Sequence, residues 1–497
     1  MDRFGDDLCE VIVDYLPIGD KLRYECISKQ FKRLLFNRHR VLVLSETSLT
    51  GFDDNVDTIS QVLTTSREYK RLFNIEIHLF RQLVAKLPWI QVLVIDNYCI
   101  IDGNVLRAIG DNCRHLRRFV CTSIKCMDIS DEDLRYFGQQ VSATLRSLQF
   151  DCLQDFQLNL ILRLTRNSIR SVNIQNNNFI VSNDFVFLDF HPASDSRDGN
   201  HISQLCPKLD TIYITCYSVE DLKRFADYYS QNIRKIEIKF VSNYMLGDVM
   251  NAGLKQLSRF VNLQSLTLLI YNYQKGFIAP IDEGLRMIGT NCPKLEHFVC
   301  EMTKNLISGQ LFQVLSPFCA LKTCKISTTY EIYDTRDPYG TVAQLAHCKH
   351  LKHITLYLKY LSDKHLSHIH LSLPHLQTFK VNTSNGFIGD KTLESLAQLP
   401  RLTTVEISGT SPALINITDE GVCPLVIKCP LLRQLCLFCK TSVGKQSVDQ
   451  FISIARKYPK NIYKYFYECN HDLCSEIPIN YELTGHPVPQ NLQIFQI

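Results

Sequence analysis

A nine-residue phrase recurs along most of this chain and restricts its possible folds more than any other feature. The phrase reads CPKLDTIYI at 206–214, CPKLEHFVC at 292–300, CKHLKHITL at 348–356 and CPLLRQLCL at 429–437. Looser copies share its apolar pattern, and the twelve intervals between residue 90 and residue 432 average about 28.5 residues. Such a regular period predicts a repeat architecture. The first apolar anchors of the thirteen copies are Ile90, Leu116, Leu145, Ile169, Leu209, Ile233, Leu263, Leu295, Leu321, Leu351, Leu376, Leu402 and Leu432.

Each period predicts one strand followed by one helix. The apolar residues at the end of the phrase alternate with polar ones, as in a strand with one buried face. Helical phrases follow at 129–141, 281–292, 361–369 and 417–427, and each begins near an Asp, Ser or Thr that can cap a helix. A lone strand and helix cannot bury their apolar sides, whereas stacked copies share a continuous core.

The pattern resembles the cysteine-containing leucine-rich repeats over residues 87–467, with a fourteenth, degenerate copy beginning at Ile462. The resemblance implies an α/β fold in which a curved solenoid has its strands on the concave face and its helices on the convex face. We expect residues 41–86 to be a linker and N-terminal cap of the solenoid, and residues 468–497 to be a C-terminal tail that caps its other end.

The repeat also explains many of the twenty cysteines. The N-terminal sequence MDRFGDDLCE has no secretory pattern, so we expect reduced thiols in a cytoplasmic or nuclear protein rather than a disulfide framework. Free cysteine packs as a small apolar residue. We therefore expect buried side chains three residues before ten of the anchors, where the residues are Leu87, Cys113, Cys206, Phe260, Cys292, Phe318, Cys348, Leu373, Leu399 and Cys429.

Residues 4–35 lie before the repeats and have a different pattern. Their apolar residues recur at helical spacing, are interrupted by Pro17, and resume after Asp20, which can cap a second helix. This predicts two or three short amphipathic helices. Such a unit is too small for a sizeable core of its own, so we expect it to dock on the repeats or on another protein.

Leu8, Ile12, Leu16 and Pro17 match the first helix and following turn of the F-box family. Asp20 and Leu22 match the start of its second helix, and Ile27, Ser28, Lys29 and Phe31 match the phrase after it. The segment is therefore similar to an F-box, and we assign residues 1–40 to that module. Phe4-Gly5 and Lys21 depart from the family pattern. The resemblance implies that the module binds an SKP-type adaptor, and through it a cullin–RING scaffold, while the repeats bind a target protein. The residues expected either to contact the adaptor or to hold the short helices together are Leu8, Val11, Ile12, Leu16, Pro17, Leu22, Ile27 and Phe31.

The side chains between the apolar anchors of each strand are expected to point into the concave face. Lys325, His353, Tyr357 and Lys380 form a candidate binding surface for an acidic or phosphorylated segment of the target. An ordinary solvated face is the alternative interpretation. Phe438, with Cys436 beside it, is apolar where solvent is expected, which indicates either a contact site or a spot covered by the C-terminal tail.

Composition and motifs exclude several other classes. The net charge of +4 is small for 497 residues and does not favour nucleic acid or a membrane surface as a partner. No window reaches the roughly 18 apolar residues of a spanning helix. Phosphate-binding, zinc-protease and nucleophile-elbow motifs are missing, so we expect no catalytic residue and no cofactor. Cys469, His471 and Cys474 provide too few ligands for a closed zinc site.

The sequence therefore favours a non-catalytic, substrate-recognition subunit of an SCF-type ubiquitin ligase. Two alternatives remain open. One is a leucine-rich-repeat scaffold or inhibitor that binds protein partners without a ligase. The other is an F-box protein that binds the adaptor without the cullin.

Overall fold

The computed structural model describes most of the repeat region and falls into two compact units, Met1–Thr215 and Cys216–Ile497. Each unit is considered by itself. The described residues are 9, 11, 34, 36, 39–44, 73–74, 77–95, 99–122, 129–151, 153, 155–173, 206–216, 219–241, 247–271, 280–303, 306–307, 310–328, 339–409, 415–441, 445–457, 463–469 and 492–496.

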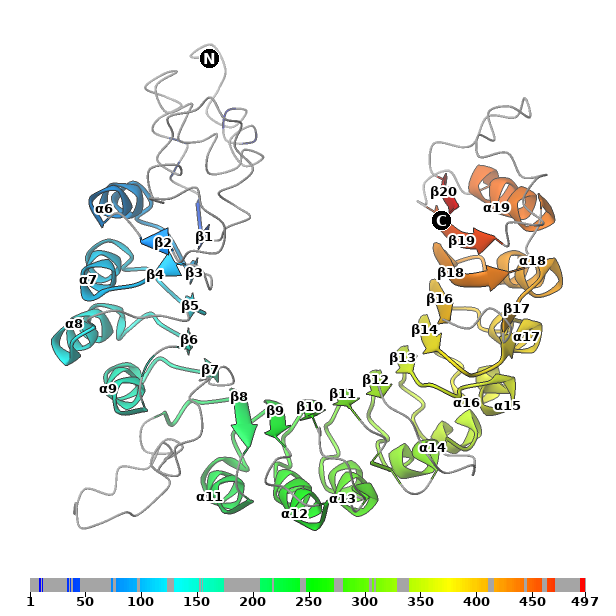
Figure 1. Ribbon diagram of the computed structural model, residues 1–497, viewed down its shortest axis with the longest axis horizontal. Coiled ribbons are helices and arrows are strands. Elements are labelled where there is room, and N and C mark those ends of the chain that lie inside the picture. Colours follow the sequence, from blue (N-terminus) through cyan, green and yellow to red (C-terminus); the bar gives the residue numbers. More distant parts are fainter. Residues whose placement is uncertain are drawn as a thin grey trace. The chain divides into compact units, whose positions relative to one another are not determined.

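Parallel strands in the first unit pair in chain order, and helices alternate with them (Figure 1). The paired strands are β1 (Val41–Leu44), β3 (Val92–Ile95), β5 (Arg118–Cys121), β6 (Ser147–Phe150), β7 (Ser171–Asn173) and β8 (Thr211–Cys216). A short parallel pair joins β2 (Phe73–Asn74) to β4 (Cys99–Ile100). The helices are α6 (Ile77–Lys86), α7 (Gly103–Asn112), α8 (Asp131–Val141) and α9 (Asp155–Thr165).

The second unit repeats the arrangement with a longer parallel sheet, whose strands also pair in chain order. Its strands are β9 (Lys235–Val241), β10 (Ser265–Tyr271), β11 (His297–Met302), β12 (Thr323–Thr328), β13 (His353–Tyr357), β14 (Thr378–Thr383), β16 (Thr404–Gly409), β18 (Gln434–Thr441), β19 (Tyr463–Cys469) and β20 (Leu492–Gln496). A separate two-stranded pair joins β15 (Ile388–Gly389) to β17 (Ile415–Asn416).

Helices of the second unit cover one side of this sheet and leave its other side open (Figure 1). Buried apolar residues between the helices and the sheet form the core. The helices are α11 (Val219–Tyr229), α12 (Gly247–Leu257), α13 (Asp282–Asn291), α14 (Leu311–Leu315), the 3-10 helix η1 (Val342–Leu345), α15 (Asp363–Leu366), α16 (Ile369–Ser372), α17 (Asp390–Leu396), α18 (Asp419–Lys428) and α19 (Lys445–Lys457).

The repeat read from the sequence is confirmed by the structure. Each of the thirteen predicted anchors lies two residues before a strand, and the most exposed of them, Leu432, is only 3% accessible. The ten apolar or cysteine residues expected at the position three before an anchor are buried as well, whereas the polar residues Ser142, Arg166 and Ser230 at the same position of three other repeats are not. The apolar pattern therefore locates the strands and the core correctly in both units, and the architecture is that of leucine-rich repeats.

The predicted helical phrases are also found, with one exception. Ser130 caps α8 through a reciprocal pair of hydrogen bonds with Asp133, and Thr418 caps α18 by accepting from the backbone of Glu420. The phrase 361–369 is not one helix but two short ones, α15 and α16. They are separated at His368, whose φ of 58° is left-handed and cannot continue a helix.

Besides the short β2, two strands of the longer parallel sheets lie outside the region in which repeats were expected. β1 lies in the segment 41–86 that we expected to be a linker and cap, and it pairs with β3. β20 lies in the segment 468–497 that we expected to be a tail, and it pairs in parallel with β19. Parallel strands therefore continue at both ends beyond the recognisable phrase.

Buried thiols at the core position contact backbone carbonyls of the preceding repeat. The Sγ of Cys429 lies 3.6 Å from the Leu396 carbonyl and 3.5 Å from that of Leu399, after the end of α17. The Sγ of Cys348 lies 3.3 Å from the Phe318 carbonyl. Each of these carbonyls also accepts a backbone N–H, so the thiol adds a second, weak donor that Leu or Phe could not supply. Burial raises the pKa of Cys348 and of Cys429 to about 12.

Candidate functional site

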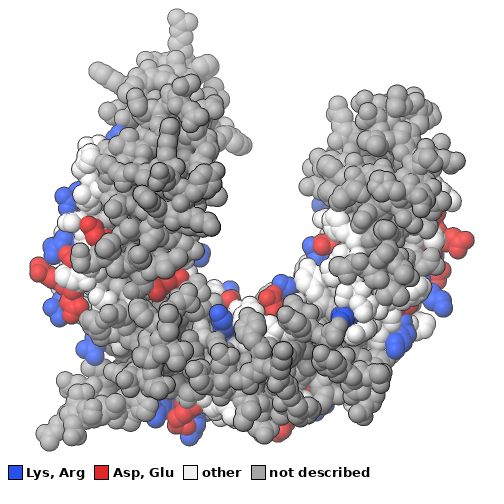
Figure 2. Space-filling model, viewed as in Figure 1, with Lys and Arg blue, Asp and Glu red and all other residues white. Residues whose placement is uncertain are grey.

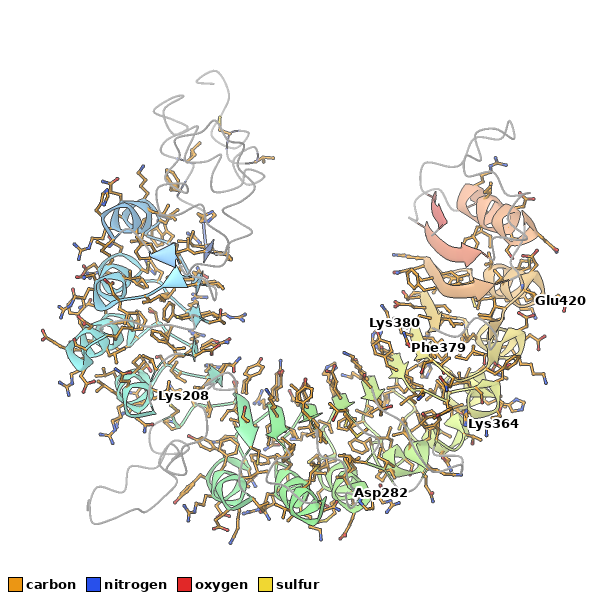
Figure 3. The ribbon with its side chains drawn as sticks, viewed as in Figure 1. Lys208, Asp282, Lys364, Phe379, Lys380 and Glu420 are labelled. Carbon is orange, nitrogen blue, oxygen red and sulfur yellow. The ribbon has the colours of Figure 1, made fainter. Side chains whose placement is uncertain are left out.

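The open side of the sheet in the second unit is the candidate functional surface. Successive residues of a strand point to opposite sides, and Figure 3 shows this for Phe379 and Lys380 of β14. Phe379 is fully buried between the sheet and the helices, whereas Lys380 is half-buried on the opposite side. We refer to the outward side chains at alternate positions of β10–β18 as the sheet face.

Regular pairing arranges the sheet face in three rows that run across the strands. In the central row, Lys325, Thr355, Lys380 and Glu406 are direct neighbours on successive strands. The other two rows flank it on either side. One contains His297, Thr323, His353, Thr378 and Thr404, and the other contains Glu301, Ser327, Tyr357, Asn382 and Ser408.

Four of the five residues predicted to bind the target lie together on this face. Lys325, His353, Tyr357 and Lys380 belong to the neighbouring strands β12, β13 and β14. Phe438 does not join them, because it lies on β18, with β16 between β14 and its strand. Whether these side chains bind a target stays a prediction.

Both lysines form ion pairs with glutamates of neighbouring strands. The Nζ of Lys325 lies 2.6 Å from Oε1 of Glu301 on β11, and the Nζ of Lys380 lies 2.7 Å from Oε2 of Glu406 on β16. The hydrogen bond from Glu406 raises the pKa of Lys380. The sequence interpretation placed the four residues on this face but did not identify the pairs. The formal charges of Lys325, Lys380, Glu301 and Glu406 therefore sum to zero.

His353 and Tyr357 lie on β13 between the two lysines. Nδ1 of His353 is 3.0 Å from the hydroxyl of Thr378, and partial burial, with the charge of Lys352, lowers the pKa of its imidazole. The Nζ of Lys325 lies 5.9 Å from the centre of the Tyr357 ring, which is within the range of a cation–π contact. At neutral pH His353 adds no positive charge to the face.

Of the two apolar residues noted on β18, Cys436 is buried and Phe438 is half-buried, so Cys436 itself is not an exposed contact residue. Cys436 is only 2% exposed, and the amide Nε2 of Gln434 lies 3.2 Å from its Sγ. Gln434 stands two residues before Cys436 on the same face of β18, and its side chain lies against the thiol. An alternating pattern alone does not reveal this contact, because it assigns sides and not the direction of a long side chain.

Few residues of the N-terminal segment are described. Val11 is 53% exposed, while Cys9, Leu34 and Phe36 are buried. Neighbouring positions of this segment thus include both an exposed apolar side chain and buried ones. The remaining residues predicted to contact an adaptor lie outside the described residues, and they are Leu8, Ile12, Leu16, Pro17, Leu22, Ile27 and Phe31.

The described surface has no large area of one charge in the view of Figure 2, where acidic and basic side chains are interspersed. No helix within the described ranges is long and apolar enough to cross a membrane. Among the same residues, no three His, Cys, Asp or Glu side chains are grouped so that they could hold a metal ion. The sheet face is therefore a polar surface with paired charges and many hydroxyl groups.

Comparison with known proteins finds similarity to solved leucine-rich-repeat structures. An internalin (inlF) from Listeria monocytogenes is 11% identical with a TM-score of 0.37, over 80% of this chain and 91% of that one. The yeast Rad7 and Elc1 complex contains a chain that is 11% identical with a TM-score of 0.43, over 77% of this chain and 88% of that one. A chain of the mouse RP105/MD-1 complex is 13% identical with a TM-score of 0.36, over 73% of this chain and 61% of that one. No protein-family model matches the sequence, and no curated protein does.

Proposed function

We propose that this protein is the substrate-recognition subunit of an SCF-type ubiquitin ligase, acting in the cytoplasm or nucleus. Its F-box-like segment would dock on an SKP-type adaptor, and its sheet face would bind the target. The observation that supports this proposal most is the order of the two parts. A segment similar to an F-box directly precedes a parallel strand–helix array that presents an open polar face over many strands.

The proposed mechanism is proximity, and this chain contributes no catalytic residue. The array would hold a target next to a ubiquitin-conjugating enzyme that the cullin–RING scaffold carries. Tethering raises the effective concentration of the target lysines, and this supplies the gain in rate. The chain must therefore be rigid enough to define a distance. Within each unit, the buried core between stacked repeats provides such rigidity.

Adaptor binding is the step that distinguishes this proposal from its alternatives. Val11 supports it, because an apolar side chain that is 53% exposed in the isolated chain is available for burial by a partner. Replacing Val11 with Asp would place a charge in the proposed contact. We expect this variant to lose adaptor binding while the repeats stay folded, because Val11 lies outside the array.

The test is co-expression of the full chain with an SKP-type adaptor, followed by gel filtration. We expect co-elution in equal amounts, and loss of co-elution after Val11→Asp or after deletion of residues 1–40. Lys380→Ala on the sheet face is the matched control and should keep the adaptor. Separate elution of the unaltered chain and the adaptor would contradict the proposal and favour a scaffold or inhibitor. Adding the cullin then separates a ligase subunit from an F-box protein that binds the adaptor alone.

A further inference from the structure

The charges on the sheet face have an unusual order. The described outward positions of the sheet face extend from β10 to Phe438 on β18. They carry four formal charges, on Glu301, Lys325, Lys380 and Glu406. Because β11, β12, β13, β14 and β16 are successive neighbours, these charges run negative, positive, neutral, positive, negative across the strands. The neutral centre is Thr355, flanked along β13 by His353 and Tyr357.

The ion pairs hold the charges in this order and still leave N–H donors of each lysine available to a partner. An ammonium group has three donors, and each lysine gives one of them to its glutamate. Each lysine remains about one third exposed, so its other donors are accessible from the open side. Each glutamate lies on the strand beyond its lysine, Glu406 in the same row as Thr355 and Glu301 in the neighbouring row, so the charge is positive on both sides of Thr355 and negative two strands away in each direction.

The spacing between neighbouring strands sets the distances between these charges. Neighbouring strands lie about 4.8 Å apart, so the strands of both glutamates are about 10 Å from β13, and Glu301 is displaced by a further two residues along its strand. An extended peptide advances about 3.3 Å per residue, so about three residues span that distance. A peptide that crosses the strands over β13 would meet Thr355 with one residue. Its residues three positions before and after would lie over β11 and β16, the strands that carry Glu301 and Glu406.

From this geometry we infer that the sheet face recognises an extended protein segment with an acidic residue at its centre and a basic residue three positions away on each side. The central carboxylate accepts hydrogen bonds from Lys325, Lys380 and the Thr355 hydroxyl, and the two basic side chains pair with Glu301 and Glu406. This rests on the proposed role of the sheet face in target binding and not on adaptor binding. It refines the expectation of an acidic or phosphorylated target, because uniformly acidic segments would be repelled by both glutamates.

The first experiment selects peptides from a random twelve-residue display library on the full-length chain. A matched variant exchanges both ion pairs, with Glu301→Lys, Lys325→Glu, Lys380→Glu and Glu406→Lys. This variant keeps both pairs and the net charge but inverts the order of charges. We expect basic-x-x-acidic-x-x-basic peptides from the natural chain, with at least tenfold weaker binding to the exchanged variant, and the inverse pattern from peptides selected on the exchanged variant.

Equal binding of one peptide set to both chains would overturn the inference. So would selection of peptides without the charge pattern, of uniformly acidic peptides, or of none at all. Adaptor binding plays no part in this measurement, so its failure and the failure of the ligase proposal are separate results.

A second pair of variants tests the centre alone and does not depend on folding of the fourfold variant. Thr355→Glu places a carboxylate of the chain itself between the two lysines, so it should occupy the proposed position of the partner's acid and reduce peptide binding at least tenfold. Thr355→Gln has nearly the same size without the charge and should stay within about threefold of the natural chain. Equal loss in both variants would show that size and not charge matters there, which would contradict the inference.

Discussion

The two sides of the sheet in the second unit both connect neighbouring repeats through polar side chains, but they do so differently. On the open side the connection is made by long, partly exposed side chains, as in the pair of Lys380 with Glu406. Exposed ion pairs of this kind contribute little to stability because water and salt screen them. Their value is in the pattern of charge that they present.

On the helix side, short aspartates connect successive repeats through backbone and hydroxyl donors. Asp390 at the start of α17 accepts from both the backbone N–H and the hydroxyl of Thr418, at 2.9 and 2.7 Å. Asp363 and Asp419 occupy similar positions in their repeats and accept from Thr392 and Ser447, whose side chains are buried. These bonds are directional and protected, so they are expected to hold the stack together.

The largest difference between the two sides should appear with Asp390→Ala. It removes the acceptor of two hydrogen bonds, and the unpaired donors of Thr418 should lower the free energy of unfolding by about 2–3 kcal/mol. Denaturant unfolding followed by circular dichroism measures this change. Asp390→Asn, which keeps one acceptor oxygen, should cost about half as much. A loss below about 0.5 kcal/mol in the alanine variant would show that the helix side is no more important than the open side.

A smaller loss is expected from Cys429→Ala, which acts in the core on the helix side. The substitution removes the thiol and its contacts with the carbonyls after α17, so we expect a loss of about 1–1.5 kcal/mol in the free energy of unfolding. Cys319 is exposed and provides the control. Its replacement by Ala should change stability by less than about 0.5 kcal/mol, and equal effects of the two substitutions would contradict the role given to the buried thiol.

On the open side, Glu406→Gln should lower stability by no more than about 0.5 kcal/mol near neutral pH. The folded state raises the pKa of Lys380, so it holds this proton more tightly than the unfolded chain. The contribution of the pair is therefore complete below the unfolded pKa of about 10.4 and is lost as the pH rises above it. Thermal unfolding at pH 8 and pH 11 should show a smaller drop for Glu406→Gln than for the natural chain. An equal drop would show that the pair has no part in this pH dependence.

The smallest effect is expected from His353. Its pKa is lowered in the folded chain, so the unfolded chain binds the proton more readily and stability falls as the pH drops below about 6.5. His353→Gln should remove this part of the acid sensitivity, with a change of a few tenths of a kcal/mol in the difference between pH 7.5 and pH 5.5. His375 lies in an exposed turn and is the control. If both substitutions have the same effect, the partial burial of His353 is not the cause.

Aligned repeats make part of this surface predictable from the sequence alone. Lys380 and Glu406 each stand four residues after their anchors, Leu376 and Leu402, so their positions side by side follow from the period. Glu301 stands six residues after Leu295, whereas Lys325 stands four after Leu321. These two residues are therefore not direct neighbours across the strands. Their ion pair depends on how far the two side chains extend, and the repeated phrase does not reveal this.

The ends of the array were less predictable for a similar reason. β1 reads VLVL and has no cysteine or proline just before it, whereas β20 reads LQIFQ and follows Pro489 but has no leucine or isoleucine at the anchor position. A short apolar run does not by itself distinguish a strand from another buried segment. The break at His368 is equally hidden, because it depends on a local backbone angle and not on the spacing of apolar residues.

The buried thiols can report local unfolding of individual repeats. Cys113, Cys206, Cys292, Cys348 and Cys429 recur at one core position, and burial raises the pKa of each to about 12. The thiolate is the reactive form, so an alkylating reagent should modify these cysteines when their repeat opens to water. The order in which they are modified would rank the repeats by stability, with exposed Cys319 as the reference for immediate labelling.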